Sequence, residues 1–192
     1  MTGRPVRTVG VAIAVPEPYG SRLQAHRASF GDPRGRTVPT HITLLPPTEL
    51  PAGSSSGNGT AVDAGVADSL SRDVEAHLAA VAASVAPFEV VLRGTASFRP
   101  VSPVVYVPLV DGGEQCGRLE RLVRSGPLAR EVAFAFHPHV TVAHGLPDEV
   151  LDEATAALAG FECRFAVDHL HLYENGADGV WRTDRSFRFG VR

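Results

Sequence analysis

Two kinds of hydrophobic pattern alternate along the chain. Short runs rich in β-branched residues are typical of strands, whereas apolar residues at three- and four-residue intervals indicate helices. Strands are predicted over 6–15, 40–47, 88–98, 102–110, 137–144, 161–175 and 180–191, and helices over 17–29, 62–85, 113–126 and 147–160. Because proline cannot donate to a β-ladder, Pro16 and the adjacent Pro46 and Pro47 are expected to end the first two strands.

The order of these elements repeats. Each half of the chain reads strand, helix, histidine-containing strand, helix and strand. Three pairs of segments align between the halves: 11–16 with 104–109, 41–46 with 139–144, and 88–98 with 161–171. This repeat predicts an internal duplication, in which two equivalent lobes face each other across a shared cleft.

We therefore expect one domain over 1–192, made of pseudo-symmetric lobes at about 1–100 and 101–192 with room for strand exchange between them. The first copy is enlarged by a longer helix and by residues 51–60 (PAGSSSGNGT), which are small, polar or proline apart from one alanine. Such a composition predicts a flexible surface loop.

Composition places the chain among ordinary globular proteins. Its 192 residues are 44% apolar and 20% charged, enough to bury a core without disulfides. Cys116 and Cys163 are therefore expected to be reduced structural thiols. No apolar run reaches the ~18 residues that a membrane span needs, and no export signal opens the sequence. We expect a cytoplasmic protein that works as a monomer and does not bind membranes.

The charge of the chain also limits the kinds of partner that it is expected to bind. A net charge of −3 does not suit a protein that grips duplex DNA through its phosphates. Residues 1–40 nevertheless hold six arginines against Glu17 and Asp32, a balance of +4. Such a patch could steer a small anionic substrate, although arginines spread over a solvated surface would give the same count.

The candidate chemistry lies in two His-x-Thr motifs, His41/Thr43 and His139/Thr141, at equivalent places in the two halves. Side chains alternate along a strand with a rise of about 3.3 Å per residue, so the histidine and threonine of each motif share one face. The intervening residues point into the core. Two such strands facing each other would give a four-cornered polar site.

This set of residues suits phosphodiester cleavage without a metal. The reaction needs a base for the attacking oxygen and an acid for the leaving oxygen, and histidine is the side chain that titrates nearest neutrality. Hydroxyl groups fixed on rigid strands can donate to the phosphoryl oxygens. A single His-x-Thr would more simply be a buried, hydrogen-bonded histidine, but two copies at equivalent positions favour catalysis.

The segments THITLL at 40–45 and HPHVTVAH at 137–144 resemble the paired motifs of the two-histidine phosphoesterase superfamily, in particular its 2′-5′ RNA ligase-like and cyclic nucleotide phosphodiesterase members. The resemblance implies an α+β, bilobal, duplicated fold with two antiparallel β-sheets and outer helices around a central cleft. It also implies cofactor-free hydrolysis of 2′,3′-cyclic phosphates or 2′-5′-linked ribose phosphodiesters of nucleotides or RNA ends, as in RNA processing. By this analogy, His41 and His139 share the acid and base roles and Thr43 and Thr141 bind phosphate.

Three further residues are candidates for substrate binding. Members of the family often carry Arg or Lys just after the second motif, where this chain has Ala143 and His144. His144 could contact phosphate or substrate, or it could be an accessory surface histidine. Phe98 and Tyr106 could stack on a base, although core packing would also explain them.

Two other functions stay open at this point. His137 with His139, and His169 with His171, each place two imidazoles on one strand face, a spacing that a metal site can use. The neighbouring Asp168 is expected to point away from His169. Alternatively, the chain could be a catalytically inactive module that holds a nucleotide or RNA end.

Overall fold

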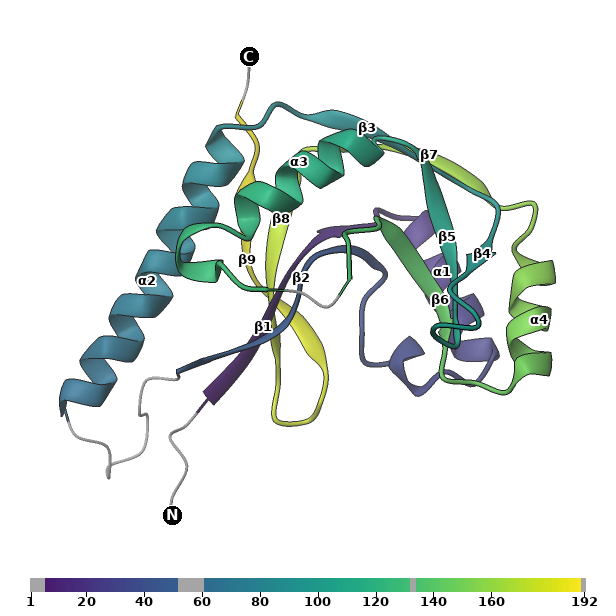
Figure 1. Ribbon diagram of the computed structural model, residues 1–192, viewed down its shortest axis with the longest axis horizontal. Helices are drawn as coiled ribbons and strands as arrows, with labels where there is room; N and C mark the ends of the chain where they lie inside the picture. Colours follow the sequence, from purple (N-terminus) through teal and green to yellow (C-terminus); the bar gives the residue numbers. More distant parts are fainter. Residues whose placement is uncertain (1–5, 52–60, 132–133, 191–192) are drawn as a thin grey trace.

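The computed structural model describes residues 6–51, 61–131 and 134–190 (Figure 1). Apart from Pro51, the predicted loop 51–60 lies outside these residues. The helices are α1 (Tyr19–Ser29), α2 (Ala61–Ala83), α3 (Gly113–Val123) and α4 (Asp148–Ala157), with 3-10 turns η1 (Pro33–Gly35) and η2 (Gly126–Leu128). The strands are β1 (Val6–Ala14), β2 (His41–Pro51), β3 (Phe88–Arg93), β4 (Ala96–Ser97), β5 (Val104–Asp111), β6 (His139–His144), β7 (Glu162–Val167), β8 (His169–Asn175) and β9 (Trp181–Arg188).

These strands form two antiparallel sheets, which confirms the predicted α+β class. The first sheet has the order β2-β1-β8-β9. In the second, the order is β4-β5-β3-β7, and β6 pairs with β5. Each sheet therefore contains strands from both halves of the chain: β8 and β9 lie in the first, and β3 and β4 in the second. Within the described residues, no helix is long and apolar enough to cross a bilayer.

Two of the predicted strands are in fact each broken into two shorter strands. Residues 161–175 form β7 in the second sheet and β8 in the first, with the break at Asp168. Residues 88–98 are interrupted at Gly94, whose positive φ of 67° turns the chain between β3 and β4. The alternation of apolar residues continues across Gly94, so the pattern could not reveal that break. At Asp168 the alternation shifts by one position, between Val167 and Leu170, and this shift marks the passage from one sheet to the other.

The prediction that Pro46 and Pro47 end the second strand is wrong. Strand β2 continues through both prolines to Pro51 and pairs with β1 as far as Val6. Because β2 is the edge strand of its sheet, a proline there can face away from the ladder and leaves no hydrogen bond unmade.

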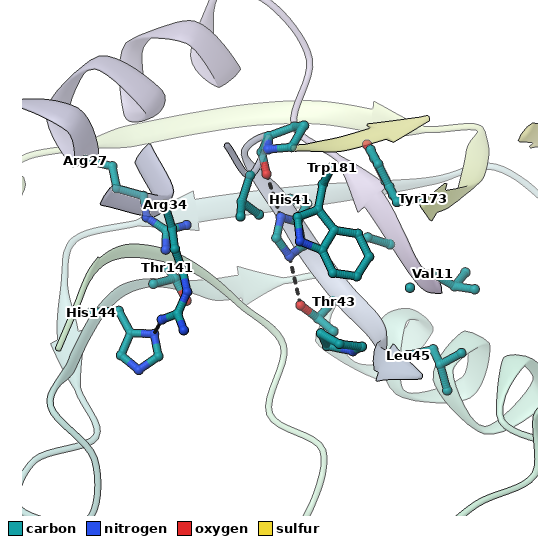
Figure 2. Close-up of a pocket in the computed structure, with 15 residues that line it drawn as sticks. Val11, Arg27, Arg34, His41, Thr43, Leu45, Thr141, His144, Tyr173 and Trp181 are labelled. Atoms are coloured by element: carbon teal, nitrogen blue, oxygen red, sulfur yellow. Dashed lines mark hydrogen bonds between the residues drawn. The ribbon is translucent and has the colours of Figure 1, made fainter. Parts of the chain in front are cut away.

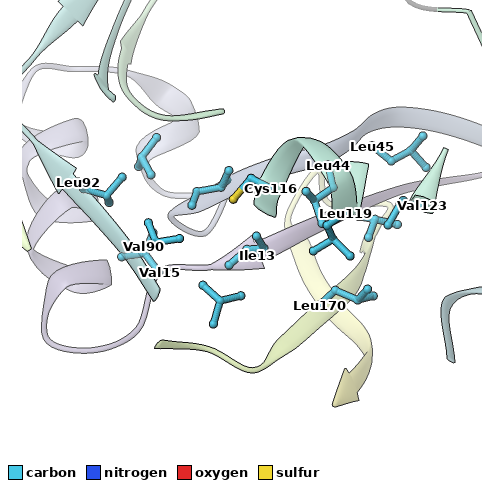
Figure 3. Packing of buried hydrophobic residues seen from close by; sticks show 14 of the residues in the cluster. Ile13, Val15, Leu44, Leu45, Val90, Leu92, Cys116, Leu119, Val123 and Leu170 are labelled. Carbon is cyan, nitrogen blue, oxygen red and sulfur yellow. The ribbon is translucent and has the colours of Figure 1, made fainter. Parts of the chain in front are cut away.

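One hydrophobic core joins both sheets and anchors the two motif strands. Figure 1 shows α2 and α4 at opposite ends of the molecule, while α3 packs against β2 and β5, one strand from each sheet. Figure 3 shows Cys116 and Leu119 of α3 among core residues such as Leu44 of β2 and Val90 of β3. Cys116 and Cys163 are both free and buried.

Candidate active site

The two motif strands are held in the same way in their two sheets. In the first sheet, His41 lies opposite Ala14 of β1, and in the second sheet, His139 lies opposite Pro108 of β5. The residues between and behind the motif positions, which are Ile42, Leu44, Val140 and Val142, are at most 1% exposed. The predicted alternation is therefore confirmed, and the histidines and threonines occupy the partly exposed face.

Both strands also contain a bulge directly after the motif threonine. On β2, Thr43 pairs with Ala12 and Leu45 pairs with Val11, so that Leu44 is an extra residue. A bulge shifts the alternation of side chains by one position and often re-aims a residue beside an active site.

The bulge on β6 changes where His144 points. Thr141 pairs with Tyr106 and Ala143 pairs with Val105, so the extra residue is Val142. Strict alternation would place His144 on the core side of the strand. After the bulge it returns to the partly exposed face that also carries His139 and Thr141.

Each motif histidine is oriented by a backbone carbonyl two residues earlier in the chain. The Nδ1 of His41 lies 2.6 Å from the oxygen of Pro39, and the Nδ1 of His139 lies 2.7 Å from the oxygen of His137. A carbonyl can only accept, so Nδ1 carries the proton and Nε2 is the free acceptor of each neutral ring. The Thr43 hydroxyl lies 3.0 Å from the Nε2 of His41, in position to donate to it.

The environment favours the neutral form of both rings. Burial is the largest cause that lowers the pKa of His41, and the charges of Arg27 and His139 lower it further, against the opposing effect of the Pro39 carbonyl. Burial likewise lowers the pKa of His139, as does the charge of His137. The two motif strands, β2 and β6, are in contact with each other although they belong to different sheets.

A pocket of about 370 Å³ opens beside these strands (Figure 2). It is lined by His41, Thr43, Thr141 and His144, but His139 is not among its lining residues. This volume lies within the range of small-ligand sites, about 300–1,000 Å³.

His139 instead packs into a cluster of aromatic rings. Phe98 stacks on Tyr106 with ring centroids 4.2 Å apart, and the His139 ring meets Phe98 edge-on at 5.0 Å and Tyr106 at 5.1 Å. His137 lies 5.3 Å from both aromatic rings. Neither Phe98 nor Tyr106 lines the pocket, and their contacts fix the orientation of His139.

Two aromatic residues of the first sheet, Tyr173 of β8 and Trp181 of β9, also line the pocket. The ring centroids of Tyr173 and His41 lie 6.5 Å apart, so an aromatic ring lies beside His41 as Phe98 lies beside His139. The pocket also contains Arg27, a buried residue of α1. Only the excess of arginine before residue 40 pointed to that side chain, without identifying it.

The second histidine pair has its own partners. The Nδ1 of His169 lies 2.7 Å from Asp168 Oδ1, and the Nδ1 of His171 lies 2.8 Å from Ser186 Oγ. The expectation that Asp168 points away from His169 is therefore wrong, because Asp168 lies in the link between β7 and β8, where strand alternation does not hold. Across residues 6–51, 61–131 and 134–190, no three His, Cys, Asp or Glu side chains gather as a metal site.

This chain therefore has two antiparallel sheets with one motif strand in each, the arrangement that the resemblance to the two-histidine phosphoesterases implied. A family model described as the 2′-5′ RNA ligase superfamily matches residues 15–179. The chain belongs to the 2′-5′ RNA ligase superfamily, as its motifs had indicated.

Individual relatives are similar to this chain in sequence, and solved structures are similar to it in fold. Proteins named "Putative phosphoesterase" from Bacillus licheniformis and Bacillus pumilus are 29% and 28% identical to this chain, over 83% of its length and 86% and 84% of theirs. The crystal structure of E. coli LigT complexed with 3′-AMP has a TM-score of 0.62 at 21% identity, covering 96% of this chain and 98% of that one. TT0787 of Thermus thermophilus has a TM-score of 0.59 at 20% identity, covering 96% and 99%.

Proposed function

We propose that the protein hydrolyses 2′,3′-cyclic phosphates, or 2′-5′-linked ribose phosphodiesters, with His41 and His139 as the acid–base pair and without a metal. Thr43 and Thr141 would donate to the phosphoryl oxygens. The observation that carries the proposal is that both histidines are oriented by a carbonyl at Nδ1, which makes Nε2 the proton-accepting nitrogen of each ring. On His41 this nitrogen faces the hydroxyl of Thr43, the residue proposed to bind the phosphate.

In the proposed reaction, one histidine takes a proton from water as the water oxygen forms a bond to phosphorus. The bond between phosphorus and one ribose oxygen breaks, and the other histidine protonates that oxygen. The product is a phosphomonoester and a free hydroxyl. The neutral state that burial favours suits the base, while the negative charge of a bound phosphate would help to protonate the acid.

A nucleotide, or the nucleotide at an RNA end, is the substrate class that the pocket supports. Tyr173 and Trp181 provide aromatic surface in the same pocket as His41 and Thr43. A base can stack on such rings. LigT of E. coli, which shares the fold, has been solved in complexes with 3′-AMP and with ATP, and we infer a ligand of the same class here.

The direct test is hydrolysis of adenosine 2′,3′-cyclic phosphate by the wild type, His41→Gln and His139→Gln. Loss of an acid or a base lowers kcat by roughly 100- to 10,000-fold, so each variant should fall into that range. His26→Gln serves as the control, because His26 lies on α1, stacks on Phe30 and does not line the pocket. Turnover in the presence of EDTA should equal turnover without it.

Three outcomes would count against the proposal. If both histidine variants keep wild-type turnover while circular dichroism reports a folded protein, acid–base catalysis by these rings is wrong. Loss of turnover in EDTA that zinc or manganese restores would favour a metal-dependent hydrolase. Tight nucleotide binding without turnover by the wild type would indicate the inactive binding module.

A further inference from the structure

Two arginines, Arg27 and Arg34, line the pocket near the end of β6. The guanidinium of Arg34, which η1 supplies, contacts the Nδ1 of His144 (Figure 2). His144 lies three residues beyond Thr141 on β6, with the bulge at Val142 between them, and both residues line the pocket. The Arg34–His144 contact therefore lies beyond the motif threonine along the strand.

Arg27 adds a second guanidinium to this end of the pocket. Its side chain is 7% exposed, and its Nε donates to Asp32 Oδ2 at 2.8 Å. The other oxygen of Asp32 accepts from the backbone N–H of Arg34 at 2.9 Å. Both oxygens of this carboxylate are thus used in holding the two arginines in place.

The terminal nitrogens of Arg27 remain available to a ligand. Among the residues that the structure describes, the only hydrogen bond of the Arg27 side chain is the one through Nε. In the described part of the chain, the fully buried side-chain atoms without a hydrogen-bond partner do not include any atom of Arg27. Its terminal nitrogens are therefore accessible, and Arg27 lines the pocket. Guanidinium groups favour phosphate because their N–H groups match its oxygens.

The charge of this region is unbalanced. The guanidinium of Arg27 pairs with Asp32, whereas the guanidinium of Arg34 has no carboxylate partner among the described residues. The pocket lining contains no aspartate or glutamate. Burial and the charge of Arg34 lower the pKa of His144, so that its neutral ring can accept from the guanidinium. Holding like charges together without an equal number of anions is unfavourable, and a bound anion would remove that cost.

We propose that Arg27, Arg34 and His144 form a second phosphate subsite, which binds a phosphate other than the one attacked between the two motifs. This inference rests on the proposed function, whose substrate it narrows to nucleotides that carry a second phosphate. A nucleoside 2′,3′-cyclic phosphate with a 5′-phosphate, or the last nucleotide of an RNA fragment, has this chemistry.

Calorimetric binding of matched product-like ligands tests the subsite without relying on turnover. The ligands are adenosine 2′- and 3′-monophosphate, and adenosine 2′,5′- and 3′,5′-bisphosphate. For the wild type, the 5′-phosphate should tighten binding about tenfold or more, the contribution of one charge-assisted hydrogen bond. Arg34→Gln should lose most of this gain and leave monophosphate binding unchanged, and Arg34→Lys should keep part of it.

Arg36→Gln is the matched control. Arg36 is an exposed arginine two residues from Arg34 that lines a neighbouring hollow instead of this pocket. The Arg36→Gln variant should retain the full preference for bisphosphates. It changes the net charge as Arg34→Gln does, but the contact with His144 belongs to Arg34. If Arg36→Gln loses as much as Arg34→Gln, the effect is general electrostatic attraction and the subsite is wrong.

The remaining outcomes separate this inference from the proposed function. Equal affinity of the wild type for monophosphates and bisphosphates, or no binding of either, overturns the subsite even if cyclic phosphate is hydrolysed. Weakening of monophosphates and bisphosphates by the same factor in Arg34→Gln would place Arg34 on the attacked phosphate and also overturn it. A preference for bisphosphates without any hydrolysis would support the subsite and refute the proposed reaction.

Discussion

Replacing Asp32 by asparagine should destabilise the protein strongly although the side chain keeps its size and shape. The amide oxygen of the new side chain could still accept from the backbone N–H of Arg34, as Asp32 Oδ1 does at 2.9 Å in the wild type. The negative charge opposite Arg27 would be lost. The side chains of the Arg27–Asp32 pair are 7% and 1% exposed, so the guanidinium would stay largely buried with no anion beside it.

The size of the effect follows from this burial. Removing one partner of a buried ion pair costs about 3–5 kcal/mol, because the remaining charge is uncompensated. Since the terminal nitrogens of Arg27 reach the pocket, we expect the lower end, about 3 kcal/mol. With a urea m-value of roughly 2 kcal/mol/M, the midpoint of unfolding should fall by roughly 1.5 M.

Urea unfolding followed by circular dichroism measures this change. Glu162→Gln is the control, because the Arg93–Glu162 pair has similar distances, 3.0 and 3.1 Å, but both side chains are more than half exposed. Its midpoint should barely move. Inorganic phosphate should raise the midpoint of Asp32→Asn more than that of the wild type, since it would bind the unpaired guanidinium groups. A midpoint for Asp32→Asn that matches the Glu162→Gln control would refute the reasoning.

Two further predictions concern the active site. The pH profile of kcat/KM should be bell-shaped, because the base must be neutral, above its pKa, and the acid protonated, below its pKa. The pKa values of His41 and His139 are both lowered from 6.5, so the maximum should lie below pH 6.5, and a maximum above that pH would contradict this. Trp181 is the only tryptophan of the chain and lines the pocket, so saturation with adenosine 3′-monophosphate should change its fluorescence. Unchanged emission at a concentration where calorimetry reports saturation would place the nucleotide elsewhere.

Much of the fold could be predicted from the sequence, because each helix carries its own periodicity. The helices predicted over 17–29 and 147–160 are found at Tyr19–Ser29 and Asp148–Ala157. What the pattern could not reveal is which sheet a strand joins. Apolar alternation depends on having one buried face, and that face exists on both sides of Asp168, where the chain passes from one sheet to the other.

The motif residues of the candidate site could be predicted from the sequence, but the arginines around them could not. His41 and His139 stood out because their motifs repeat, and alternation correctly placed them on the partly exposed face. The arginines carried no such signal, because no repeat distinguishes Arg27 and Arg34 from their neighbours. Their meeting with His144 depends on how α1 packs against β6 and how η1 packs against α1, which are tertiary contacts.

The shared bulge explains how a duplicated fold can hold an asymmetric ligand. Both motif strands repeat the histidine, the threonine and the extra residue, so the proposed acid–base pair is symmetric. The position that the bulge re-aims is Pro46 on β2 but His144 on β6, and only the second can bind Arg34. If the proposed function is right, the two equivalent histidines would act as acid and base. The difference between Pro46 and His144 after the bulge would then determine the orientation in which the nucleotide binds.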